Sequence, residues 1–396
     1  MRAPDAAVPF SGEERRCAAA LAGDRDALLE VLAGQEKDPS AFLATGARLP
    51  AALAHRAASA DPPIPLPPGL RARLARAAAI WVLAERTLED LGACLGAAEV
   101  AWAPIKGADV ATRVYPDPAV RPMTDLDLLV PEASFREARR AVEASGWRSA
   151  VPGPRFERYV EEEGSAWTAA REGAPLPVEL HFRLWGFVPA GLGDALLERA
   201  AADPSLGATG RRLRLADAFL LAAVHPWLHL PPRSLANWWE LHLLAEAGGA
   251  ELAGEVADQA RRWGLQLPVV LSAAQVATLW RDSPAGRTAA TLVAELGAGL
   301  RRSERLAARR ALARHPGSVS IELLAIARRL AGRPSRSGWR PVLRRFWAHP
   351  GIVERLTPEA WSWPRRRAVH LLRCLGVLRT SRADPWRAPT HGHRAR

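Results

Sequence analysis

The sequence predicts an α+β protein in which a small mixed-sheet core is flanked by N-terminal and C-terminal helical regions. Three observations support this fold class. Alanine, leucine and arginine, which favour helix over sheet, dominate the 396 residues. Apolar residues recur at helical spacing on both sides of a central stretch. Within that stretch, about residues 97–190, short strand-like segments alternate with helical ones, as in a small α/β unit.

Residues 12–96 are expected to form the N-terminal helical region. Apolar residues recur at helical intervals between Leu28 and Leu32 and again between Phe42 and Leu53. A proline-rich stretch at 61–68 interrupts the pattern. A long amphipathic helix is then predicted from about Gly69 to Gly96.

The first half of the core contains two predicted strands. Val100 to Ile105 is short and apolar, and Lys106-Gly107 directly after it is typical of a turn or a helix start. A short helix is expected over 108–115, followed by a proline-rich loop at 116–122. The segment from Asp125 to Val130 alternates in the manner of a second strand.

The second half of the core begins with an amphipathic helix predicted over Glu132 to Ser145, with Gly146 as its C-terminal stop. Residues 155–163 and 165–171 are interpreted as a hairpin around Gly164. Val178 to Leu184 is expected to be the last strand of the core.

Helices are expected again over 191–300, where Pro226 should kink or end one of them. An arginine-rich helical extension follows at 301–380, and the tail at 381–396 is predicted to be disordered. The net charge of +12 belongs to this end of the chain. Residues 301–396 hold 23 arginines and five acidic residues, a net +18, which leaves −6 for the first 300. Such a segment suits RNA or an acidic partner, or is a solvated helical surface.

Several classes of protein are disfavoured. Cys17, Cys94 and Cys374 lie far apart, which argues against a zinc site and a disulfide framework. No apolar stretch reaches the roughly 20 residues of a membrane span, and Met1 to Phe10 lacks the features of a signal peptide. We therefore expect a cytoplasmic protein.

The candidate chemistry begins with Asp125-Leu126-Asp127-Leu128. Because side chains alternate along a strand, the leucines can enter the core while both carboxylates project from the opposite face. Two adjacent carboxylates repel each other unless a cation lies between them, and hard oxygen ligands suit magnesium. The tripeptide alone is also compatible with a solvated strand end, so its context decides.

Two other segments supply that context. In the predicted strand starting at Val178, alternation places Glu179, His181 and Arg183 on one face, so Glu179 can supply a third acid. His181 is equally compatible with a packed structural role. Upstream, Gly107 would let backbone N–H groups approach phosphates closely. Lys106 is one of only two lysines among 54 basic residues, which suggests a specific need for its ammonium group.

Taken together, these segments resemble the uncharacterised bacterial nucleotidyltransferase family of the DNA polymerase β-like superfamily. The resemblance covers about residues 12–260. It is carried by Ile-Lys-Gly-Ala at 105–108, Tyr-Pro-Asp-Pro at 115–118, Arg-Pro-Met-Thr-Asp-Leu-Asp-Leu-Leu-Val at 121–130 and Val-Glu-Leu-His-Phe at 178–182.

The resemblance implies Asp125, Asp127 and Glu179 as catalytic and metal-binding residues. They would hold Mg²⁺, two ions by the family pattern and with Mn²⁺ as an option, and an NTP such as ATP would be the co-substrate. Lys106, Gly107, Ala108, Arg121 and His181 would contact the nucleotide, with Lys106 and Arg121 neutralising phosphate charge.

The chain also departs from the family pattern. Ala108 replaces the superfamily's second glycine or serine, so a side-chain phosphate contact is lost there and Lys106 would compensate. His225 and Trp239-Glu240 correspond to a histidine and a tryptophan-acid pair of the family, with glutamate where aspartate is expected.

The function expected from this resemblance is transfer of NMP from an NTP to a hydroxyl acceptor, with release of pyrophosphate. The acceptor could be a small molecule, a protein or RNA. The alternative is a non-catalytic module that binds nucleotide, RNA or protein through the basic C-terminal region. A toxin-like transferase acting on tRNA is a third hypothesis.

Overall fold

A computed structural model of the chain describes residues 10–37, 49–151, 165–184, 191–227 and 235–302, and the single positions 153, 157, 160, 304, 305, 308, 362 and 364. The chain separates into two compact units. One comprises 1–150 and 165–317, and the other comprises 151–164 and 318–396. Almost all described residues belong to the first unit, which contains the strands and helices named below.

The centre of this unit is a five-stranded sheet in the order β1-β2-β5-β4-β3. Strand β2 pairs in parallel with β5, while the other neighbours are antiparallel, so the sheet is mixed as predicted. All five strands are short. Their bounds are β1 Ala103–Pro104, β2 Leu126–Leu129, β3 Arg148–Ser149, β4 Ala166–Ala170 and β5 Val178–His181.

The register of the sheet separates an apolar face from a polar one. Leu128 of β2 lies opposite Leu180 of β5, which in turn lies opposite Trp167 of β4, and all three are fully buried. One residue earlier on β2, Asp127 lies opposite Glu179. Because side chains alternate along each strand, the row of buried apolar residues and the row of acids face opposite sides of the sheet.

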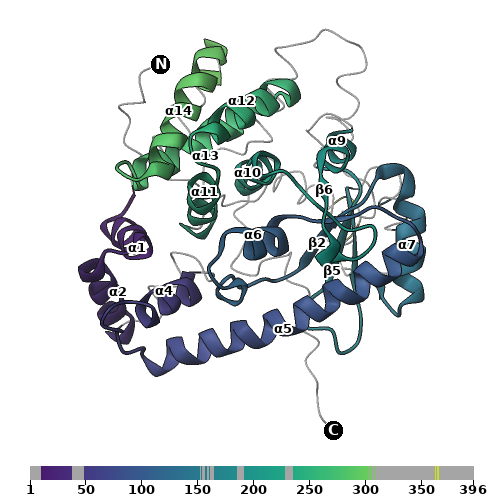
Figure 1. Cartoon of the computed structure of the whole chain (residues 1–396), viewed down its shortest axis with the longest axis horizontal. Coiled ribbons are helices and arrows are strands. Elements are labelled where there is room, and N and C mark those ends of the chain that lie inside the picture. Colours follow the sequence, from purple (N-terminus) through teal and green to yellow (C-terminus); the bar gives the residue numbers. More distant parts are fainter. Residues whose placement is uncertain are drawn as a thin grey trace. The chain divides into compact units, whose positions relative to one another are not determined.

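Residues 12–96, which were predicted to be a helical region, are largely helical where the structure describes them. They form α1 (Gly12–Ala22), α2 (Arg25–Lys37), α4 (Leu49–Ala58) and α5 (Pro68–Ala97). Helix α1 begins with a capping box, in which the Ser11 hydroxyl accepts from the Glu14 amide and the Glu14 carboxylate accepts from the Ser11 amide. Figure 1 shows α5 extending from α4 to α7 (Phe135–Ala144) beside the sheet.

The two helices expected inside the core, over 108–115 and 132–145, are both present. Helix α6 (Lys106–Val114) connects β1 to β2 and begins two residues earlier than predicted. The predicted loop after it contains a single 3-10 turn at Pro118–Val120. A 3-10 turn at Glu132–Ser134 leads into α7, which stops before Gly146, where φ is 95° as expected of a glycine terminator.

The described part of 191–300 also consists largely of helices, with α9 (Leu192–Arg199) followed by five longer ones. Helix α10 ends at Val224, immediately before the 3-10 turn His225–Trp227 that contains Pro226. The indole of Trp280 donates to the Ala18 carbonyl at 2.9 Å and thereby joins this region to α1. The five helices are α10 (Leu215–Val224), α11 (Leu235–Gly248), α12 (Glu251–Trp263), α13 (Gln266–Leu279) and α14 (Pro284–Gly299).

One local prediction was wrong, and one small sheet was not predicted. The first arm of the predicted hairpin was expected at 155–163, but its two described residues, Glu157 and Val160, are helical. Strand β4 pairs instead with β3 and β5. A second, two-stranded sheet formed by β6 (Ala201–Ala202) and β7 (Arg211–Arg212) was not anticipated, because two residues are too few to establish alternation.

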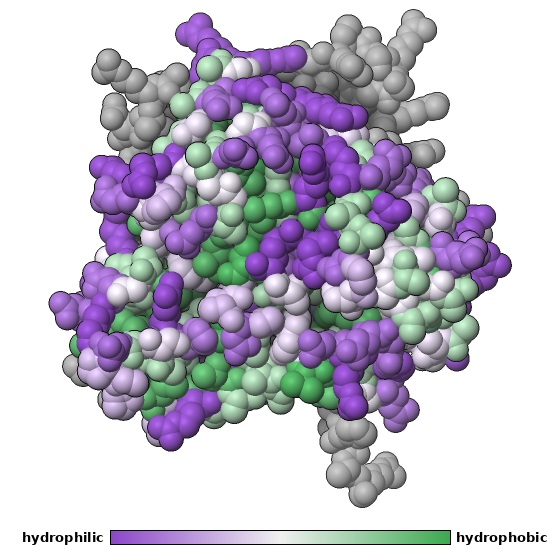
Figure 2. Space-filling model, viewed as in Figure 1, coloured by the Kyte–Doolittle hydropathy of each residue, from purple (hydrophilic) through white to green (hydrophobic). Residues whose placement is uncertain are grey.

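The surface of the described part is largely polar. Figure 2 shows charged and polar residues over most of the visible face, with apolar residues in its middle and along its lower edge. Among the described residues, the exposed large apolar side chains are Leu29, Val82 and Leu83. None of the described helices combines the length and apolar character needed to cross a membrane. The predicted regions 301–380 and 381–396 lie outside the described residues, apart from five single positions and the first two residues.

Candidate active site

The site is built where two parallel strands place their acidic residues side by side. Asp127 of β2 lies opposite Glu179 of β5, and Leu129 lies opposite His181. His181 therefore projects from the same face as Glu179 and lies diagonal to Asp127. This is the arrangement that alternation predicted separately for each strand. The pairing of the two strands brings both predictions to one place.

A lysine from a third element joins these residues. The Lys106 ammonium donates to Oδ1 of Asp127 at 2.6 Å, and its Nζ lies 3.2 Å from Nε2 of His181. The same His181 nitrogen is 2.8 Å from Asp127 Oδ1 and 3.4 Å from Glu179 Oε2. The side chain of Asp127 is 5% exposed and that of Glu179 is 32% exposed. The cluster is therefore buried at Asp127 and open to solvent at Glu179.

Burial disfavours the charged form of all four side chains, but contacts among them shift each pKa in the opposite direction. Against burial, the charge of Lys106 and the hydrogen bond from His181 keep the pKa of Asp127 below its ordinary value. Against burial, the hydrogen bond from His181 lowers the pKa of Glu179. Burial would lower the pKa values of Lys106 and His181, yet the neighbouring carboxylates raise both. The carboxylates are thus held ionised next to cationic partners.

The backbone at Lys106 is unusual. Its φ is 51°, in the left-handed region that non-glycine residues seldom adopt. Such a conformation costs about 1–3 kcal/mol and persists only where the surrounding structure enforces it. Here the preceding residue is fixed to the sheet, because the Ile105 amide donates to the Asp127 carbonyl at 3.0 Å. The strained residue at the start of α6 is the one whose ammonium reaches Asp127.

Gly107 leaves room for an arginine. A Cβ at this position would lie 2.5 Å from Nη1 of Arg121. Arg121 is buried, and its Nη2 pairs with Oε1 of Glu240 on α11 at 2.9 Å. The sequence suggested that Gly107 opens the backbone to phosphate. In the structure, the space that the glycine leaves is taken by the Arg121 guanidinium, and Ala108 is buried beside it.

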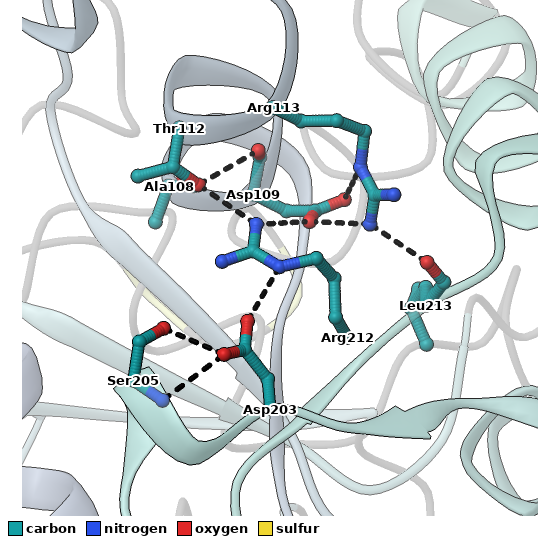
Figure 3. Close-up of polar contacts among 8 residues, drawn as sticks. All are labelled: Ala108, Asp109, Thr112, Arg113, Asp203, Ser205, Arg212 and Leu213. Atoms are coloured by element: carbon teal, nitrogen blue, oxygen red, sulfur yellow. Dashed lines mark hydrogen bonds and ion pairs between the residues drawn. The ribbon is translucent and has the colours of Figure 1, made fainter.

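A second polar network fixes the other side of α6 (Figure 3). Asp109 is 1% exposed, and Arg113 donates to its two carboxylate oxygens at 2.7 and 3.3 Å. Arg113 also donates to the Leu213 carbonyl at 2.7 Å. Arg212 of β7 bridges the Thr112 hydroxyl and the Asp203 carboxylate. These hydrogen bonds connect α6 to the segment that leads into α10. They hold the helix in place behind its strained first residue.

Asp125, the first acid of the predicted pair, precedes β2 and is partly buried. Its charge is close enough to help raise the pKa of Lys106. The donor atoms that gather within 4.8 Å of one another belong to Asp127, Glu179 and His181, a set able to hold a metal ion. The structure therefore brings together Asp127 and Glu179 of the predicted acids and adds His181. The predicted metal role of Asp125 stays a prediction.

A comparison with protein families identifies the chain. The model of a family described as uncharacterised nucleotidyltransferase matches residues 36–281, more than half of the sequence. The chain belongs to this nucleotidyltransferase family. The match confirms the resemblance stated from the motifs and supports a transferase activity. No curated protein matches the chain.

The match to the nucleotidyltransferase family extends past the sheet to the end of α13, and two residues of this later part are informative. Glu240, noted in the sequence as a counterpart of a family acid, reaches back to Arg121 beside Gly107. His242, two residues on, stacks on Trp239 at a centroid distance of 4.9 Å and lies tilted against Trp280 at 4.7 Å. Burial lowers the pKa of His242 to about 4, which fits a neutral packed ring.

The Arg121–Glu240 contact is the main feature that sequence reasoning missed. The motifs suggested a phosphate contact for Arg121 and gave Glu240 no partner. Each is a charged residue next to apolar or aromatic neighbours, Val120 and Trp239, which is the available signal for a buried pair. Arg183, expected on the face of Glu179, lies beyond the end of β5 and pairs with Glu132 at 2.7 Å.

Proposed function

We propose that this nucleotidyltransferase moves a nucleoside monophosphate from an NTP to a hydroxyl acceptor and releases pyrophosphate, with Mg²⁺ at Asp127 and Glu179. The observation that carries the proposal is the in-register pair of ionised carboxylates on neighbouring parallel strands. Two carboxylates and an imidazole within 4.8 Å of one another form a donor set that fits a divalent cation. A polymerase β-like core, with Asp125 as a further metal ligand, is part of the same proposal.

In the proposed step, the acceptor oxygen attacks the α-phosphorus. The bond between that phosphorus and the oxygen bridging to the β-phosphate breaks, and pyrophosphate departs. Bound divalent ions would supply positive charge to the attacking and leaving oxygens. Glu179, whose side chain is 32% exposed, is accessible to an acceptor and takes its proton. Asp127 is buried, and its ionised carboxylate keeps negative charge in the site for the cations.

Lys106 carries the phosphate side of the proposal. Its ammonium belongs to the first residue of α6, and the first amide groups of a helix have no partner within the helix. A compact charge on a flexible stem can move from Asp127 to a triphosphate oxygen without moving the backbone. Arg121 adds positive potential beside Gly107. Because Glu240 already pairs with Arg121, we assign the direct phosphate contact to Lys106.

A labelling experiment would identify the acceptor. The arginine-rich segment 301–380, most of which lies outside the described residues, is the part expected to hold RNA or an acidic partner. The full chain would be incubated with each of four NTPs labelled at the α-phosphate, Mg²⁺ and a fractionated cell extract. We expect label in one acceptor fraction together with released pyrophosphate. A truncation at about residue 300 that labels the same fraction equally well would argue against RNA binding by the C-terminal region.

Site variants make the test specific. Asp127→Asn and Asp125→Asn should abolish labelling while the far-ultraviolet circular dichroism spectrum stays unchanged. The matched control is Asp258→Asn, which removes a 77% exposed carboxylate on α12. It should label like the natural protein. Undiminished labelling by Asp127→Asn would show that the proposed site is not where transfer occurs.

A further inference from the structure

His181 directs one ring nitrogen at both carboxylates of the cluster, beside the ammonium of Lys106. Its Nε2 lies 2.8 Å from Asp127 Oδ1, 3.4 Å from Glu179 Oε2 and 3.2 Å from Lys106 Nζ. Without a metal ion, the protonated ring nitrogen and the ammonium both donate to Asp127 Oδ1, which brings two positively polarised groups within 3.2 Å of each other.

A divalent cation accepts lone pairs from all three side chains at once. Neighbouring ligands on an octahedral ion with bonds of about 2.1 Å lie about 3 Å apart. The spacings of 2.8 and 3.4 Å from His181 Nε2 to the two carboxylates lie on either side of that value. The three donor atoms all lie within 4.8 Å of one another, and His181 is 5% exposed, so its ring direction is set by packing.

The ammonium of Lys106 lies where this cation would bind. Its ammonium is 2.6 Å from Asp127 Oδ1 and lies beside His181, so a positive charge already occupies the centre of the cluster. A metal bound to the same oxygen would compete with the ammonium. The flexible lysine stem lets the ammonium leave, whereas the buried imidazole would stay.

We propose that His181 ligates the catalytic metal through Nε2, together with Asp127 and Glu179, and that the site therefore prefers Mn²⁺ or a later divalent transition ion to Mg²⁺. Imidazole suits transition ions, while carboxylates alone suit magnesium and manganese alike. This inference rests on the proposed function in placing the metal at the same carboxylates. It adds a nitrogen ligand and an ion preference.

The test is Mn²⁺ binding to the full chain, free of any histidine tag and without nucleotide. Continuous-wave electron paramagnetic resonance would give the affinity, and pulsed measurements would detect nitrogen coupled to the bound ion. We expect a ¹⁴N coupling that changes to the ¹⁵N pattern when the protein is labelled with ¹⁵N-histidine. This comparison uses the natural sequence, so it does not depend on how a variant folds.

Variants locate the coupled nitrogen among the 10 histidines. His181→Gln should abolish the coupling and weaken Mn²⁺ binding by about tenfold or more, with a smaller effect on Mg²⁺. His55→Gln on α4 is the matched control and should keep both affinity and coupling. Asp127→Asn should lose binding altogether. Lys106→Met should bind Mn²⁺ more tightly, because the competing ammonium is gone.

The other outcomes separate this inference from the proposed function. Mn²⁺ bound without any nitrogen coupling, and unaffected by His181→Gln, would overturn the imidazole ligand while leaving a carboxylate metal site. A measured preference for Mg²⁺ would overturn the stated ion choice. Absence of Mn²⁺ binding would overturn the inference as a whole, and labelling of an acceptor by NTP would then test the proposed transfer by itself.

Discussion

Removing the carboxylate of Glu240 should destabilise the protein far more than removing a surface carboxylate of the same geometry. Glu240 pairs with Arg121 at 2.9 Å, with side-chain exposures of 9% and 5%. Glu240→Gln would leave the arginine charge buried without its carboxylate, which typically costs about 3–5 kcal/mol. The control, Asp258→Asn, breaks a contact with Arg261 that is also 2.9 Å long, but with side chains 77% and 47% exposed. It should cost less than about 1 kcal/mol.

The assay is urea unfolding followed by circular dichroism, with the free energy of unfolding compared among the variants. The double variant Arg121→Met with Glu240→Leu removes both charges and should be more stable than Glu240→Gln alone, because no unpaired charge stays buried. A recovery of stability in the double variant distinguishes a buried ion pair from loss of packing. If Glu240→Gln cost no more than Asp258→Asn, or if the double variant were no more stable than Glu240→Gln alone, the reasoning would be refuted.

Two further predictions concern packing beside the site. Gly107→Ala should lower the free energy of unfolding by about 1–3 kcal/mol, because the new Cβ would lie 2.5 Å from the Arg121 guanidinium. Gly254→Ala, with nothing within 4 Å of its Cβ, should instead stabilise α12 by up to about 1 kcal/mol, and equal effects in urea unfolding would contradict the argument. The pKa of His242, lowered to about 4 by burial, predicts a pH effect. Between pH 6.5 and 4 the unfolded chain binds a proton at His242 that the folded chain does not, so stability falls as the pH falls, by at most about 3 kcal/mol. His242→Gln should remove that part of the pH dependence in denaturation curves measured between pH 4 and pH 7, and an unchanged slope would argue against a buried neutral ring.

The sequence was most informative where residues follow a regular period, because the period determines which face of a strand or helix each side chain occupies. Alternation along 125–128 and 178–182 predicted which side chains share a face, and the structure has Asp127, Glu179 and His181 on one face. The long helix was predicted within a residue or so of its observed ends at Pro68 and Ala97, because its apolar spacing persists for many turns.

Features that depend on distant pairing could not be predicted in the same way. The register that sets Asp127 opposite Glu179 joins strands between which α7, β3 and β4 lie among the described residues. The Arg121–Glu240 pair joins the segment before β2 to a helix far along the chain. The left-handed backbone of Lys106 is enforced by its surroundings, since lysine has no intrinsic preference for it. Periodicity contains none of this information.

The most direct test of the central claim measures pyrophosphate released from NTP by purified full chain in the presence of the acceptor fraction. We predict release that requires a divalent ion, is lost in Asp127→Asn and persists in Asp258→Asn, with both variants folded. Release that continues in Asp127→Asn, or that persists after complete removal of divalent ions by a chelator, would contradict a metal-dependent transfer centred on β2 and β5.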